Sequence, residues 1–142
     1  MLGALQSRMA TFRNRDKMMK IETVYLSQKA KDQLLKLKRT TGIENWNILC
    51  RWAFCLSLAD STLPTSPVEK NEHAIEMSWK VFGGQEHALY LALLVSRCKN
   101  DNLSLCRETL ALQLRCHLNR GISLLSEKLG RGDIGTLMSI LQ

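Results

Sequence analysis

The sequence predicts a mainly helical protein with one or two short β-strands. Apolar residues recur at helical spacing through most of the chain after residue 27, and two short segments alternate in the way strands do. No internal repeat or low-complexity tract divides the 142 residues, a length that suffices for one hydrophobic core and is short for two. We expect one compact domain of about five helices at 20–142, after a flexible basic arm at 1–19.

The first expected elements are a strand at 20–26 and a helix at about 28–41. The strand segment is rich in β-branched and aromatic residues. Ser27 is a good N-cap for the helix, and Gly42 stands where a helix commonly ends. The two faces of the strand carry Ile21, Thr23 and Tyr25 on one side and Glu22, Val24 and Leu26 on the other. The core face of the helix carries Ala30, Leu34, Leu37 and Thr41.

A second helix is expected from Trp46 to about Ala59, with Asn45 as its cap. Its apolar residues surround nearly the whole circumference, so it must be covered on several sides, either within the domain or by another subunit. The strand, helix, helix order at 20–59 is similar to ribbon-helix-helix regulators, whose paired strands enter the major groove. This strand is poor in side chains that read bases, which favours contacts to phosphates.

The second half of the chain is expected to contain a loop, a short strand and three helices. Pro64 and Pro67 mark the loop. A strand is expected in AIEMSWKVFGG, residues 74–84, where Ile75, Met77, Trp79 and Val81 alternate with other residues until the glycine pair. Helices are expected at 85–100, at about 105–128 with Gly121 as a candidate bend, and at 134–141 after Asp133. The inward residues of the long helix are Leu110, Leu114, Leu118 and Leu125.

Charge and cysteine content indicate a polyanionic partner and a reducing compartment. The net charge is +7 and the pI is about 9.4. Residues 1–60 hold eleven Lys and Arg against five Asp and Glu, a net +6. Five cysteines without a secretory signal predict free thiols in the cytosol, and no apolar run is long enough to span a membrane. Residues 1–18 either form a mobile basic arm or precede the native start at Met18 or Met19.

No catalytic, metal or cofactor motif is recognisable. The cysteines lack CxxC or CxxH spacing, and FGG lacks the rest of a phosphate-binding loop. His73, His87 and His117 show no spacing typical of a nucleophile and its base. We therefore expect no cofactor and no enzyme activity, with the cysteines as small core residues. These are Cys50, Cys55, Cys98, Cys106 and Cys116.

The stronger signal is the basic first helix together with the residues just before it, which predicts binding to duplex DNA because each neutralised phosphate releases condensed counterions. The alternative is a solvated helix face. The DNA-binding candidates are Lys17, Lys20, Lys29, Lys31, Lys36, Lys38 and Arg39. On the first helix, Lys31 and Lys38 lie on one flank of the core face, and Lys29 and Lys36 lie on the other.

Several stretches resemble the DndE family of DNA sulfur modification proteins over about residues 20–125. The strongest is TGIENWNILCRWAFCLSL at 41–58, joined to the preceding LKLKRTTG. MSWKVFGG at 77–84, ALYLALL at 88–94 and LQLRCHLNRGISLL at 112–125 add to it.

The resemblance implies a bacterial cytoplasmic protein that works with the other Dnd proteins, a compact helical fold, a homotetramer, and a lysine-rich surface that prefers nicked duplex. Here Lys29, Lys31, Lys36 and Lys38 would form that surface. Both core and subunit contact are expected from Trp46, Ile48, Leu49, Trp52, Phe54 and Leu56. The alternatives are a sulfur relay through Cys50, Cys98, Cys106 or Cys116, a nicking enzyme, and a protein-only adapter for the modification complex.

Overall fold

Four long helices, one short helix and a two-stranded antiparallel sheet build the part of the chain that the computed structural model describes, residues 20–65 and 73–129. In chain order the elements are β1 (Thr23–Leu26), α2 (Gln28–Thr41), α3 (Trp46–Ala59), β2 (Ile75–Ser78), α4 (Trp79–Gly83), a 3₁₀ turn (Gly84–Glu86), α5 (His87–Asn100) and α6 (Arg107–Leu129). The predicted mainly helical class is confirmed. The arm expected at 1–19 and the helix expected at 134–141 lie outside the described residues.

The strand β1 pairs with β2 of the same chain, so that Val24 lies opposite Met77 and Leu26 opposite Ile75. Val24 and Leu26 point into the core, as a strand with one buried face requires. Ile21, predicted on the opposite face, is also buried, at 4% exposure, because the strand begins only at Thr23. The strand, helix, helix order of ribbon-helix-helix proteins is present, but the strand has its partner within the chain.

The capping residues explain where α2 begins and ends. The Ala30 N–H donates to Ser27 Oγ at 3.2 Å, and Gly42 ends the helix with a φ of 75°. That left-handed backbone suits glycine, which has no Cβ. The bounds predicted for α2 and α3 are confirmed. Asn45 occupies the cap position of α3, but its side chain makes no capping hydrogen bond.

The strand predicted at 74–84 is correct only as far as Ser78. The Val81 N–H donates to Ser78 Oγ at 3.2 Å, and this local bond begins the short helix α4. The alternation therefore stops, since Trp79 is buried and Val81 is 53% exposed. The helix predicted from 85 begins as a 3₁₀ turn and becomes α5 at His87.

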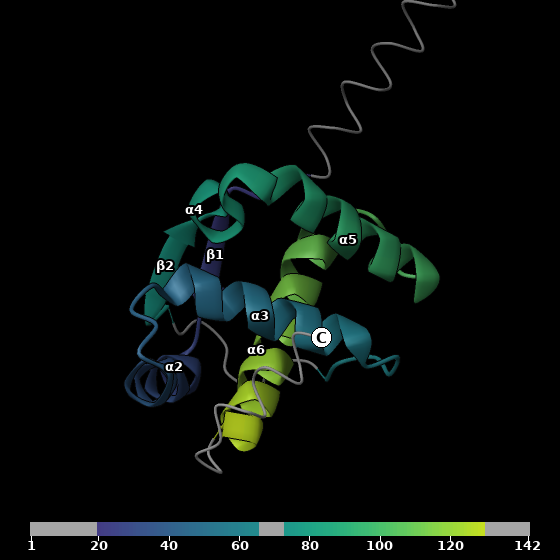
Figure 1. Cartoon of the computed structure of the whole chain (residues 1–142). Coiled ribbons are helices and arrows are strands. Elements are labelled where there is room, and N and C mark those ends of the chain that lie inside the picture. Colours follow the sequence, from purple (N-terminus) through teal and green to yellow (C-terminus); the bar gives the residue numbers. More distant parts are fainter. Residues whose placement is uncertain (1–19, 66–72, 130–142) are drawn as a thin grey trace, which may run out of the picture.

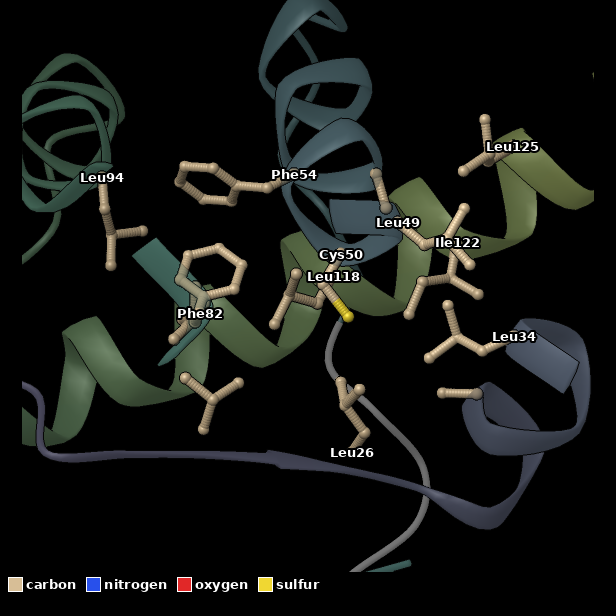
Figure 2. Packing of buried hydrophobic residues seen from close by; sticks show 14 of the residues in the cluster. Leu26, Leu34, Leu49, Cys50, Phe54, Phe82, Leu94, Leu118, Ile122 and Leu125 are labelled. Carbon is tan, nitrogen blue, oxygen red and sulfur yellow. The ribbon is translucent and has the colours of Figure 1, made fainter. Parts of the chain in front are cut away.

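The core lies where α3 crosses α6 (Figure 1). Gly121 of α6 lies so close to α3 that an added Cβ would be 1.8 Å from the Ala53 carbonyl oxygen. Phe54 of α3 and Phe82 of α4 meet edge to face at 5.9 Å between ring centroids (Figure 2). The helix α2 packs beside α6, where Gln33 Nε2 donates to Ser123 Oγ at 3.4 Å. All four leucines predicted to point inward from α6 are buried.

Candidate nucleic-acid interface

The described basic candidates lie on α2 or just before β1. Lys29, Lys36 and Arg39 are exposed, whereas Lys31 and Lys38 are partly buried beside the start of α3. Lys20 is exposed. Lys17 lies outside the described residues.

The four lysines of α2 are divided between two flanks of the helix, as their helical spacing predicts. Each flank borders a groove. On the α6 side, a groove of about 480 Å³ includes Lys29, Gln33 and Ser123 in its lining. On the α3 side, a groove of about 440 Å³ includes Lys31 and Trp46. A single flat lysine patch is therefore absent from α2.

The cationic groups of α2 form no ion pair with any acidic residue at 20–65 or 73–129. The ion pairs in this part of the chain join Arg97 to Asp101 at 2.9 Å, Arg107 to Glu22 at 3.5 Å and Arg120 to Asp60 at 3.9 Å. Asp32, the acid on α2, accepts a hydrogen bond from Gln28 Nε2 at 2.9 Å. Lys38 Nζ lies 4.7 Å from the centre of the Trp46 ring, a cation–π contact. The charges of α2 therefore remain available to an outside anion.

Three arginines elsewhere hold the fold together. Arg97 and Arg120 both donate to the Thr62 carbonyl oxygen, at 2.7 and 2.8 Å. They also donate to the last carbonyls of α3, Arg97 to Leu58 O and Arg120 to Ser57 O. Helix ends leave carbonyls without partners, and these guanidinium groups satisfy them.

Another arginine ties α3 to α4. Arg51 donates through Nε to the Phe82 carbonyl oxygen and through its terminal nitrogen to the Val81 carbonyl oxygen at 3.2 Å. The charge of Arg51 is thus also used within the fold, in contrast to those of Lys29 and Lys36.

The structure brings together a Ser, His and Arg cluster that the sequence did not predict. Ser57 Oγ lies 2.8 Å from His117 Nδ1 and accepts a hydrogen bond from Arg120 Nε at 2.8 Å. Burial, with a smaller contribution from nearby arginines, lowers the pKa of His117 to about 4. Ser57 and His117 are both 0% exposed, so this pair offers no access to a substrate.

The thiols proposed for a relay differ in accessibility. Burial raises the pKa of Cys50 to about 12 and that of Cys98 to about 11, and it also raises the pKa of Cys116. Cys106 is partly exposed, and hydrogen bonding to Thr109, whose Oγ1 lies 3.1 Å from its sulfur, lowers its pKa. Cys55 is exposed on α3, so its predicted place in the core is wrong.

The described residues contain no cluster of three or more His, Cys, Asp or Glu side chains that could hold a metal ion. Within the same ranges, no helix has both the length and the apolar composition needed to cross a membrane.

The expected core and contact residues of α3 separate into two groups. Leu49 and Phe54 are completely buried within the chain. Trp46, Ile48, Trp52 and Leu56 are only partly buried. By helical spacing, the solvent-facing side of α3 carries Ile48, Trp52, Cys55 and Ala59, and none of these is charged.

The comparisons with known proteins identify relatives of this fold. The family model of DNA sulphur modification protein DndE matches residues 23–131. One similar solved structure is the crystal structure of DndE from Escherichia coli B7A, involved in DNA phosphorothioation modification. Its sequence is 25% identical to this chain, the TM-score is 0.59, and the match covers 74% of this chain and 96% of that chain. A second is the crystal structure of a DndE glycine-to-lysine mutant involved in DNA phosphorothioation. Its sequence is 23% identical to this chain, the TM-score is 0.58, and the match covers 76% of this chain and 99% of that chain. At this identity the match supports the fold alone. The search of curated proteins gave no match.

Proposed function

The chain belongs to the DndE family of DNA sulphur modification proteins, and on this premise we propose that it is a non-catalytic, oligomeric DNA-binding protein of the phosphorothioation system. In this role it binds duplex DNA, preferentially where one strand is nicked, in the bacterial cytoplasm and beside the other Dnd proteins. Its part is to hold the DNA, while other components of the system perform the sulfur chemistry.

The observation that carries this proposal is the contrast between the two sets of basic side chains. Arg51, Arg97 and Arg120 are engaged in bonds that hold the fold, whereas Lys29 and Lys36 are exposed and form no ion pair with any described residue. Exposed ammonium groups that form no ion pair can contact phosphates without reading sequence, and Lys29 and Lys36 present two of them on one flank of a single helix.

The division of the lysines between two flanks suits a duplex groove. An α-helix is about 10–12 Å wide, close to the roughly 12 Å width of the major groove of B-DNA. Lys29 and Lys36 on one flank and Lys31 and Lys38 on the other can therefore reach the phosphates of both strands. A nick makes the duplex easier to bend, which lowers the cost of fitting it to the protein.

The outward side of α3 supports self-association. Ile48 and Trp52 are partly exposed, Cys55 and Ala59 are exposed, and the stripe that they form is apolar along the helix. An exposed apolar helix face of this kind is typical of a subunit contact. We place the tetramer contact here, with Leu56 at its margin and Trp46 outside it.

The lysine surface is tested by a charge-matched pair of double variants. Lys29→Glu/Lys36→Glu should weaken binding to a nicked duplex by about tenfold or more, because phosphate contacts are replaced by repulsion. Lys80→Glu/Lys99→Glu changes the net charge equally at two exposed positions on α4 and α5 and should have much less effect. Equal effects of the two variants, or unchanged binding in the first, would reject this surface.

Salt dependence separates DNA binding from a protein-only adapter. If the lysines contact phosphates, the affinity of the purified protein for nicked duplex falls steeply between low and physiological salt. An absence of binding even at low salt would instead favour the adapter.

Cys106 gives a sulfur relay its best support, since it is the partly exposed thiol with a lowered pKa. Thiol labelling of the native protein tests this second candidate. Selective labelling of Cys106 would favour the relay if, in addition, its thiolate accepts the outer sulfur of a persulfide on a donor protein and releases the donor thiolate.

A further inference from the structure

The groove on the α3 side of α2 is lined by aromatic, amide, acidic and basic side chains, not by lysines alone. Its volume is about 440 Å³, within the range of sites that hold small ligands. Three elements converge on it. Its lining includes Lys31 of α2, Asn45, Trp46 and Asn47 at the start of α3, and Glu76 and Met77 of β2.

The polar groups in the groove suit a nucleobase better than a bare phosphate. The Glu76 carboxylate would repel a phosphate but can accept a hydrogen bond from the exocyclic amino group of a base. Asn47 Nδ2 donates to the Val81 carbonyl oxygen at 3.2 Å, which leaves its amide oxygen as an acceptor. The Asn45 side chain makes no capping bond, so its amide can both donate and accept. Trp46 supplies an aromatic surface among these groups.

We propose that this groove receives one unstacked base from the strand end at a nick, with the base packed against the Trp46 indole. This inference rests on the proposed DNA-binding function and explains its preference for nicks. An intact duplex must first unstack and unpair a base, whereas a base beside a strand break is released at lower cost. The groove therefore discriminates between the two DNAs, while the lysines bind both.

The contact between Lys38 and Trp46 fits this role. Lys38 Nζ lies 4.7 Å from the ring centre in the free protein. Stacking of a base on an aromatic side chain is stronger than an exposed cation–π contact. An entering base thus displaces the ammonium group, which then lies near the backbone of the same nucleotide. Lys31, in the groove lining, offers a second ammonium to that phosphate.

Affinities for nicked and intact duplexes of the same sequence test the inference. Trp46→Leu should lower the affinity for nicked duplex by about tenfold and leave that for intact duplex nearly unchanged. Trp46→Phe keeps an aromatic ring and should retain most of the preference. Leu89→Ala removes an apolar side chain that is 53% exposed on α5 and does not line the groove, so it serves as the control.

Photo-cross-linking tests the wild-type protein directly. A duplex with 5-iodouracil at the nick should cross-link to Trp46, as mapped by mass spectrometry, and the same base placed far from the nick should not. Cross-links elsewhere, or an unchanged ratio of nicked to intact affinity in Trp46→Leu, would overturn the groove while leaving the lysine surface standing. A change in oligomer size in Trp46→Phe would identify the groove as a protein contact and also overturn it. If the wild-type protein binds no DNA at low salt, both proposals fail together.

Discussion

His117 is held in a neutral form between α3 and α6. Its Nδ1 is bonded to Ser57, and its Nε2 is buried without a hydrogen-bond partner among the described residues. The charges that act on it are those of Arg97 and Arg120, which disfavour a second positive charge, and that of Asp101, which favours it. Burial and the arginines dominate, so protonation of this imidazole opposes folding.

The pH dependence of stability follows from that environment. The pKa of His117 is about 4 in the folded chain against 6.5 in the unfolded chain, so the unfolded chain binds the proton more readily between these values. The free energy of unfolding should therefore be highest above pH 6.5 and fall by about 3 kcal/mol as the pH approaches 4. Urea denaturation at pH 7 and pH 4.5 measures the fall. A His117→Gln variant should lose most of this dependence, and an equal fall in that variant would contradict the assignment.

Individual residues were predictable where a local pattern determines burial. Cys50, Cys98 and Cys116 lie among apolar neighbours and are buried as predicted. Cys55 also has apolar neighbours in the sequence, but it faces away from the core and is exposed, so the local pattern predicts its burial wrongly. The contact between Ser57 and His117 joins positions 60 residues apart, and only the crossing of α3 over α6 brings them together. The only hint of this contact in the sequence is that Ser57 and His117 are polar residues among largely apolar neighbours on their helices.

The bounds of helices were predictable where capping residues mark them. Ser27 and Gly42 fixed α2, since both act through bonds or backbone angles within a few residues. The transition from β2 to α4 was not predictable from Ile75, Met77, Trp79 and Val81, because these residues continue to alternate through it. The Ser78 hydroxyl decides the outcome by capping α4, and a serine can equally stand inside a strand.

The approach of α6 to α3 makes Gly121 the most sensitive glycine of the described helices. In Gly121→Ala the new Cβ would meet the backbone of Ala53, which cannot rotate away, so we expect a loss of about 3 kcal/mol or more in the free energy of unfolding. The gain in helix propensity, about 1 kcal/mol, does not offset it.

Gly42→Ala is the matched comparison for this prediction. No atom lies within 4 Å of its added Cβ, so only the φ of 75° is unfavourable and the expected loss is about 1–2 kcal/mol. Urea denaturation ranks the two variants. A Gly121→Ala protein as stable as Gly42→Ala would show that the two helices can separate at little cost.

At the scale of the whole molecule, the excess of basic residues in the N-terminal half can be counted from the sequence, and the division of the α2 lysines between two flanks follows from helical spacing. Two other features required the fold. Arg97 and Arg120 are used within the fold because their guanidinium groups reach carbonyl oxygens at the end of α3. The groove beside Lys31 exists because β2 lies next to the start of α3. Neither relation is local in the sequence.

In the proposed tetramer, assembly and DNA binding should be coupled, because each added subunit would present another α2 to the same duplex and so raise the effective concentration of lysines. Ile48→Glu/Cys55→Glu places charges on the apolar stripe of α3 and leaves α2 intact, so we expect a monomer that binds nicked DNA on the order of 100-fold more weakly. Ser96→Glu/Asn100→Glu adds the same charge at exposed positions on α5 and should change neither property. Light scattering gives the size, and titration with nicked duplex gives the affinity. A monomer that binds as tightly as the wild-type protein would show that one copy of α2 suffices and would remove the physical reason for the assembly.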